Sequence, residues 1–378
     1  MPTRAQDPDR RLPAGVRAVD RAADLPRRGW DALAGPGDLF LTCRWLDVAE
    51  ATAGVPMRYL WTERDGQPVA ALATALATAS APWMLGRPDA VLRGSADAGL
   101  PGAAEFLTDL VDDPTSELLP ALLAGGRHIG NTRILCGPSA TEHDLAALVE
   151  AAESQAYGTG AAGPCFLYLG EAADPDRRLG ALLAARGYES FVSGHYSVLR
   201  VPKDGYEGYL ATLPRKRRVS VAAERRRVRA ADVRTVLEPL ADADLVRFAA
   251  LEAELLEKYG IDWAPDQSMP VLRQARDVFG DDAFAAVARA DGDIRGFALI
   301  LRHGDHWYAR QTGYDYAYQR RTGLPLYFEL LYYRLVEEAT AAGVSVIHYG
   351  LGSTDTKLSR GCTATEQRCH VLRPGSRA

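Results

Sequence analysis

Metal-type cysteine spacing, long apolar runs and lysine are all scarce in this sequence. Its five cysteines are scattered along 378 residues with no Cys-x-x-Cys pair, which argues against a disulfide framework and against a zinc site. No stretch approaches the roughly 20 consecutive apolar residues of a membrane-spanning helix, and residues 1–13 lack the apolar run of a signal peptide. We therefore expect a cytoplasmic protein with no membrane span, no bound metal and no other cofactor.

The basic residues of this sequence are almost all arginines. The net charge of −5 gives no reason by itself to expect a polyanionic partner. Only four of the 44 basic residues are lysines, and arginine takes the place of lysine on most solvated surfaces under genome-wide compositional pressure. A lysine that remains, such as Lys357, is a candidate for a specialised role.

Length and patterning predict two domains that follow a disordered tail at residues 1–13. The first half contains a helix at 40–54 and a hairpin with Asp65-Gly66 at its turn. Its other expected elements are a leucine-rich helical stretch at 101–126, a strand at 131–139, a helix at 141–156 and a strand at 164–170. Alternating helices and strands favour a layered α/β or α+β module.

The second half has a similar order of elements. A helix at 240–260 precedes three strands, whose turns contain Asp291-Gly292 and residues 303–305. A helix at 324–343, closed by glycine, and a strand at 345–352 follow. The predicted order is therefore helix, three strands, helix, strand.

This order, an antiparallel meander that leads into a helix and a further strand, resembles the GNAT fold of acyltransferases. The segments GYLATLPRKRRVSVAAERRRVRAADVRTV at 208–236 and IHYGLGSTDTKLSRGC at 347–362 are similar to the FemABX branch of that superfamily. The similarity covers most of residues 200–365, and residues 30–170 in outline. It implies two tandem GNAT-like domains, 14–175 and 176–378, each a mixed, mostly antiparallel sheet flanked by helices.

The strand at 345–352 and the loop after it carry the closest correspondence to the FemABX pattern. Lys357 matches the family lysine, whereas His348 or Tyr349 stands where the family has aspartate, and Thr356 replaces a common aromatic residue. Acyl transfer to an amine passes through an oxyanion that a placed cation stabilises. The resemblance implies that role for Lys357; the alternative is a surface ion pair with Asp355.

Further site residues follow from the same resemblance. Asp315, at the end of the Gly-Tyr-Asp strand, is the expected general base, although many GNAT-type enzymes use water or the substrate itself. Arg310, Tyr349 and Arg360 are expected to bind substrate. Arg360 has the fork geometry for a phosphate or carboxylate, and a surface role is the equal alternative.

Residues 319–325 partly match the loop that cradles pyrophosphate in acyl-CoA-dependent GNAT enzymes. Arg320, Arg321 and Gly323 are candidate donor-binding residues, and Arg320 and Gly323 fit the spacing. Pro325 replaces the final small residue and contributes no N–H group. Half of the phosphate loop is therefore present.

Residues 214–231 form a predicted helix with a dense basic face. Its candidate phosphate-binding residues are Arg215, Lys216, Arg217, Arg218, Arg225, Arg226 and Arg229. Such a face fits the backbone of a nucleic acid. The alternative is a solvated helix packed through Val219, Ala222, Val228 and Val233.

Together these features predict a transferase that moves an amino acid from aminoacyl-tRNA to an amine, because FemABX-type enzymes use that donor. The acceptor is a small amine, as in natural-product biosynthesis, or a cell-wall precursor. The first alternative is an N-acyltransferase dependent on acyl-CoA or a carrier protein, which the 319–325 loop favours. The second is a non-catalytic binding module with a degenerate GNAT fold.

Overall fold

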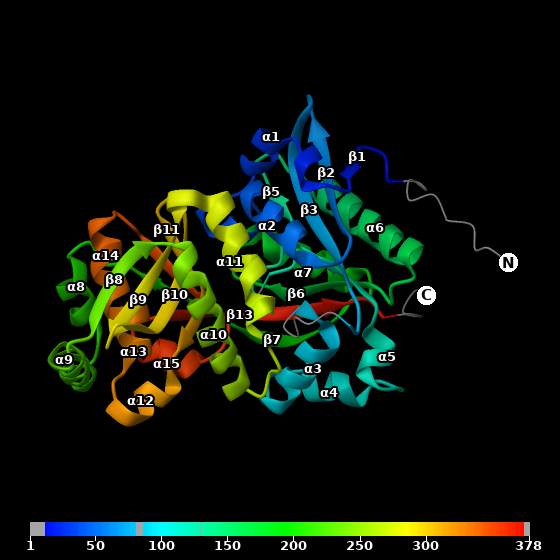
Figure 1. Ribbon diagram of the computed structural model, residues 1–378. Coiled ribbons are helices and arrows are strands. Elements are labelled where there is room, and N and C mark those ends of the chain that lie inside the picture. Colours follow the sequence, from blue (N-terminus) through cyan, green and yellow to red (C-terminus); the bar gives the residue numbers. More distant parts are fainter. Residues whose placement is uncertain (1–11, 81–85, 129, 374–378) are drawn as a thin grey trace. The chain divides into compact units, whose positions relative to one another are not determined.

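The computed structural model describes residues 12–80, 86–128 and 130–373 and divides into two compact units (Figure 1). Unit 1 comprises Met1–Tyr196 and Thr365–Ala378, and unit 2 comprises Ser197–Ala364. The sequence places its boundary at residue 175, whereas this division falls within strand β7 (Glu189–Arg200) and again within β13 (Thr363–Val371). The tail expected at 1–13 lies outside the described residues except for Leu12 and Pro13.

Unit 1 is built on a sheet with strand order β1-β2-β3-β4-β6-β13, in which β4 and β6 pair in parallel. Its strands are β1 (Val16–Val19), β2 (Met57–Arg64), β3 (Gln67–Ala77), β4 (Ala121–Ala124), β5 (Leu135–Cys136), β6 (Pro164–Leu169) and β13, with part of β7. Its helices are η1 (Ala22–Asp24), α1 (Arg27–Asp31), η2 (Pro36–Leu41), α2 (Cys43–Ala53), α3 (Pro88–Asp97), α4 (Ala103–Thr108), α5 (Pro114–Leu118), α6 (Glu142–Thr159) and α7 (Asp174–Ala185).

Two expectations for this half have opposite outcomes. The hairpin is confirmed: Asp65 and Gly66 both have positive φ, which the turn between β2 and β3 requires. The prediction of helix throughout 101–126 is wrong, because α4 and α5 are short and residues 121–124 form β4. All four residues of β4 are buried, and a strand covered on both faces has the apolar run of a buried helix.

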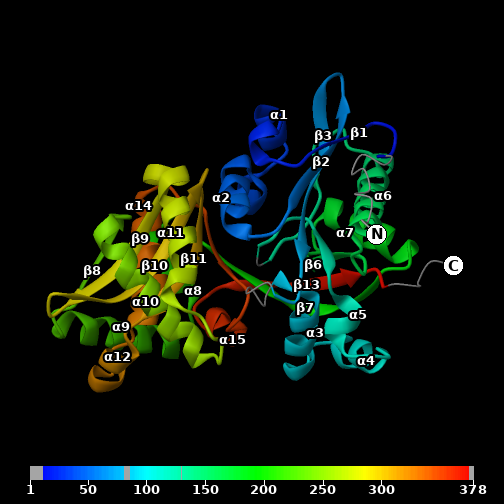
Figure 2. The same cartoon turned by 45° about the vertical axis from the view of Figure 1, so that its right-hand side comes forward.

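Unit 2 has strand order β7-β12-β11-β10-β9-β8, and the pair β11–β12 is parallel. Figure 2 shows β8, β9, β10 and β11 of this sheet as neighbours. Its strands besides β7 are β8 (Arg234–Pro239), β9 (Ala283–Ala290), β10 (Asp293–His303), β11 (His306–Tyr314) and β12 (Val346–Gly350). Its helices are α8 (Gly205–Thr212), α9 (Arg215–Ala230), α10 (Asp242–Lys258), α11 (Pro265–Phe279), η4 (Gly280–Asp282), α12 (Tyr316–Thr322), α13 (Leu326–Phe328), the π-helical turn η5 (Glu329–Arg334), α14 (Leu335–Ala341) and α15 (Thr354–Leu358).

The predicted order of the second half is confirmed, with α11, α12 and β8 as additions. Alternation along β10 separates the two faces of its sheet. Phe297 stacks on Phe248 of α10 with ring centroids 4.4 Å apart, while Ala298 packs in the cluster that contains Leu330 of η5. The strands thus lie between two helical layers, which confirms the mixed α/β fold class.

Across residues 12–80, 86–128 and 130–373, no helix has the length and apolar character needed to cross a membrane.

Candidate active site

Strands β11 and β12 separate after a short parallel contact. Their register covers His306–Tyr308 and Val346–His348 among the described residues, while β11 continues to Tyr314. Beyond this contact, the register between β10 and β11 passes from Ala309 to Gln311, so Arg310 is the extra residue of a β-bulge. Bulges re-aim side chains and are common beside active sites. The separating ends of β11 and β12 therefore define the candidate site.

A buried histidine lies where the two strands separate. The ring of His348 stacks on Tyr308 with centroids 4.1 Å apart, and its Nε2 lies 2.9 Å from Nδ1 of His306. Burial, with a smaller effect of His306, lowers the pKa of His348 to about 3. A neutral imidazole thus lies at one of the two positions matched to the family aspartate.

Lys357 lies on α15 with its ammonium group turned back toward the end of β12. Its Nζ donates to the carbonyl oxygens of Tyr349, Gly350 and Leu351 at 2.8, 3.0 and 2.7 Å. The side chain is 5% exposed, and burial lowers its pKa to about 8. Three carbonyl acceptors stabilise the charged form, so a cation is held at this strand end. The alternative environment, a surface ion pair with Asp355, is not the one that the structure shows.

Tyr349 and Arg360 both lie in the protein interior. Tyr349 stacks on Tyr332, and its hydroxyl donates to the carbonyl of Leu331. The guanidinium of Arg360, 2% exposed, donates to both carboxylate oxygens of Glu224 at 3.2 Å, to the hydroxyl of Tyr333 and to Ser359, and it stacks on Phe328. The fork of Arg360 is therefore occupied by protein groups, and its environment is not a surface.

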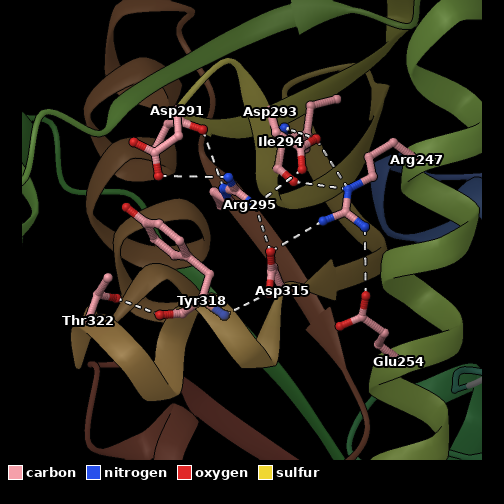
Figure 3. A network of polar contacts seen from close by, with 10 residues as sticks. Arg247, Glu254, Asp291, Asp293, Ile294, Arg295, Asp315, Tyr318 and Thr322 are labelled. Carbon is pink, nitrogen blue, oxygen red and sulfur yellow. Dashed lines mark hydrogen bonds and ion pairs between the residues drawn. The ribbon is translucent and has the colours of Figure 1, made fainter.

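Asp315 caps α12 and joins a network of arginines (Figure 3). Its carboxylate accepts from the backbone N–H of Tyr318 at 2.7 Å, from Arg295 at 2.9 Å and from Arg247 at 3.4 Å. Burial alone would raise the pKa of this carboxyl, but these hydrogen bonds and charges hold it below its usual value. Asp315 is kept ionised, and its carboxylate oxygens already accept hydrogen bonds from protein groups. Both effects disfavour its action as a general base.

A second carboxylate, which the sequence interpretation missed, lies beside the bulge. Glu252 of α10 accepts a 2.6 Å hydrogen bond from the side-chain amide of Gln311, the residue after Arg310. Burial raises the pKa of Glu252, against the opposing effects of Ser268, Arg310 and Gln311. The available signal was its spacing: Glu252 follows Leu245 by seven residues and Phe248 by four, which places a carboxylate on the apolar stripe of α10.

Helix α9 presents six of its basic side chains to solvent. The exposed residues are Arg215, Lys216, Arg218, Arg226, Arg227 and Arg229, while Arg217 is half-buried. Arg225 points inward, donates to Glu337 at 2.5 and 2.8 Å and to Glu329 at 3.4 Å, and stacks on Tyr206. The helix packs through Val221 and Val228. Val219, a packing residue in the alternative of a solvated helix, is 65% exposed.

The candidate phosphate-loop residues belong to a short helix and its end. Arg320 and Arg321 are exposed in the last turn of α12, and Gly323, with φ of 66°, closes that helix. Pro325 then precedes the helical run that starts with α13. Left-handed geometry at Gly323 favours glycine at the helix end whether or not a phosphate binds there.

The helix-flanked meander, the bulged strand and the separating parallel pair define a GNAT-type acyltransferase domain in the second half of the chain. Residues 215–358 match the family model described as an acetyltransferase (GNAT) domain, which agrees with the GNAT-type domain that the sequence predicts for this part of the chain. The expected enzyme class, an acyltransferase, is confirmed at this level. A comparison with curated protein sequences returns no match.

Solved structures show the same fold along nearly the whole chain. The crystal structure of FemX has 12% sequence identity and a TM-score of 0.61, and the similarity covers 94% of this chain and 97% of that one. A tandem GNAT protein from the clavulanic acid biosynthesis pathway has 14% identity and a TM-score of 0.54, with 95% and 99% covered. At these identities the likeness shows the fold alone, which agrees with the expected arrangement of two tandem GNAT-like domains.

Proposed function

We propose that the protein is an aminoacyltransferase that moves an amino acid from aminoacyl-tRNA to the amine of a small molecule or a cell-wall precursor, with formation of an amide. The FemABX resemblance of residues 200–365 supports the donor, and the six exposed basic side chains of α9 carry this proposal. Such a row attracts the phosphates of an RNA backbone. The proposed donor places the reaction in the cytoplasm.

The rotation of α9 about its axis is fixed by buried ion pairs. Arg225 binds Glu337 and Glu329, and the adjacent Glu224 binds Arg360 and the hydroxyl of Tyr333. Two neighbouring residues on one side of the helix are thereby anchored, and six of the other basic residues face solvent. Rigid presentation of like charges that repel one another supports a polyanionic ligand better than a general solubility role.

For the chemical step, we assign Lys357 the role of the cation near the developing oxyanion. Its ammonium group is held at the end of β12, where the strands separate. One of its three hydrogen bonds to backbone carbonyl oxygens must be replaced by a hydrogen bond to the oxyanion. Arg310, in the bulge, and Tyr349 remain proposed substrate contacts. The guanidinium of Arg360 is already hydrogen-bonded to Tyr333 and to Glu224 of α9. We therefore assign Arg360 to the anchoring of α9 and not to substrate binding.

The donor is tested by amide formation with charged tRNA. Activity that ribonuclease abolishes is expected, and activity with acyl-CoA alone would contradict the proposal. Arg226→Glu with Arg229→Glu should weaken tRNA binding and flatten its salt dependence, since each lost phosphate contact lowers the log–log slope by about 0.7–0.9. Arg21→Glu with Arg177→Glu, two exposed arginines of unit 1, is the matched control and should change neither.

A second candidate is an N-acyltransferase that uses acyl-CoA or an acyl carrier protein. The acetyltransferase description of the matching family model and the exposed Arg320 and Arg321 favour it. Calorimetric titration with coenzyme A tests this candidate. Binding that Arg320→Glu with Arg321→Glu weakens would support it, and no heat at millimolar coenzyme A would exclude the coenzyme A form.

A further inference from the structure

A polar pair beside the β11 bulge has no part in the transfer chemistry assigned above. Gln311, 7% exposed, donates through Nε2 to Oε2 of Glu252 at 2.6 Å, and Ser268 of α11 hydrogen-bonds the same carboxylate. Three elements of unit 2, α10, α11 and β11, thus converge on one carboxyl group. Its place next to Arg310 puts it at the end of β11 that separates from β12.

The other end of the Gln311 amide is an acceptor without a donor. Its Oε1 is buried and receives no hydrogen bond in the described part of the chain. Buried polar atoms are nearly always hydrogen-bonded, so this acceptor leaves a place for a donor that is not part of the protein, either a water molecule or a ligand N–H group. The amide orientation is fixed, because its N–H group must face the carboxylate of Glu252.

We propose that Glu252 and Gln311 form the subsite for the acceptor amine, with Gln311 Oε1 accepting one amine N–H and Glu252 receiving the proton that the amine loses. This assignment rests on the proposed function. Both groups are hydrogen-bond acceptors toward the ligand, so they select an N–H donor and disfavour a carboxylate or phosphate. Arg310, the charged group that acts on Glu252, disfavours an ammonium ion and favours the neutral, nucleophilic amine.

The proton balance of the step follows from this placement. The amine nitrogen attacks the carbonyl carbon of the donor, and the new C–N bond forms as one N–H proton passes to a carboxylate oxygen of Glu252. The C–O bond to the tRNA ribose breaks, or the C–S bond of a thioester donor, and the leaving oxygen or sulfur takes that proton. Burial raises the pKa of Glu252, which brings its basicity closer to that needed near neutral pH.

The close approach of α10 to β11 is what brings the pair together. At Gly313 an added Cβ would lie 2.3 Å from the backbone carbon of Leu251 and 2.4 Å from the backbone nitrogen of Glu252. Only a residue without a side chain allows this contact. Glu252 is therefore positioned by backbone packing and not by its side-chain bonds alone.

Steady-state kinetics of amide formation tests the subsite. Glu252→Gln should lower kcat/KM by about 10²–10⁴-fold and remove the rise of rate with pH that titration of a base produces. Gln311→Met should raise KM for the amine and leave the rise of rate with pH unchanged. Glu257→Gln, an exposed position on the same helix, is the control. Unchanged pH dependence in Glu252→Gln would overturn the base assignment even if the rate falls.

Direct binding separates this inference from the transferase proposal. Titration of the resting protein with a panel of primary amines, such as propylamine and 1,3-diaminopropane, should give binding that Glu252→Gln and Gln311→Met each weaken at least about tenfold. Absence of amine binding by the wild type overturns the subsite, whereas amide formation in the same preparation would leave the transferase standing. Amine binding without amide formation from either aminoacyl-tRNA or acyl-CoA would contradict the transferase proposal and leave the subsite standing.

Discussion

The ammonium nitrogen of Lys357 lies 2.8 Å from the carbonyl oxygen of Tyr349, and its other two bonds reach the next two carbonyls of the chain. The end of β12 is thereby tied to α15. Lys357→Met should lower the free energy of unfolding by about 1–3 kcal/mol, because buried carbonyl groups lose their donor. Urea denaturation measures this change. Lys203→Met, at an exposed position, should alter stability by less than about 0.5 kcal/mol.

The same lysine should make stability depend on pH at the alkaline end. Its pKa is about 8 in the folded protein, against an ordinary value of 10.5, so the unfolded chain binds more protons between these values. The contribution of Lys357 to the free energy of unfolding therefore rises with pH across that window. Unfolding of wild type and Lys357→Met at pH 7.5–10 should show a growing difference in favour of the wild type. A constant difference would contradict the shift.

Neighbouring arginines of α9 should respond differently to the same substitution. Arg225 is buried in an ion pair with Glu337, whereas Arg226 is exposed. Arg225→Met should cost about 3–5 kcal/mol of stability, because Glu337 and Glu329 lose their compensating charge in a buried setting. Arg226→Met should stay within about 0.5 kcal/mol. Equal effects in thermal or urea unfolding would show that Arg225 does not anchor the helix.

Local signals in the sequence account for the parts of the fold that were predicted. Asp65-Gly66 and Asp291-Gly292 are both hairpin turns, because the positive φ values depend only on adjacent residues. Arg225, by contrast, is one of several similar arginines, and its partner Glu337 lies 112 residues away. Gln311 is likewise 59 residues from Glu252. Which charged side chain points inward depends on such distant partners, and a single sequence does not reveal them.

Removal of Asp315 should destabilise the protein through a helix cap and an ion network together. The carboxylate caps α12 and binds Arg295, and these contacts hold its pKa below the usual value although burial acts in the opposite direction. The stabilisation is present above the pKa of the unfolded chain and is lost as pH falls through the lower folded value. Asp315→Asn, which keeps a cap acceptor, should unfold with a weaker acid dependence than the wild type. Asp315→Ala should lose about 1 kcal/mol more than Asp315→Asn.

Gly313 offers the most direct test of how α10 is held against β11. A methyl group there would lie within 2.6 Å of three backbone atoms of Leu251 and Glu252, none of which can move without the helix. Gly313→Ala should therefore cost about 1–3 kcal/mol in unfolding experiments, as overpacking does elsewhere. It should also displace Glu252 from Gln311, so the variant should lose amine binding along with stability.

A glycine with open space around it is the matched control for this substitution. Gly94, inside α3, would place a Cβ with no atom within 4 Å, and its φ is not in the left-handed region. Gly94→Ala should raise the free energy of unfolding by about 0.4–1 kcal/mol, because alanine restricts the unfolded chain more than glycine does. Opposite signs for the two glycines are therefore expected. If Gly313→Ala were as stable as the wild type, α10 would not be held by close backbone contact, and the placement of Glu252 beside the β11 bulge would lose its structural basis.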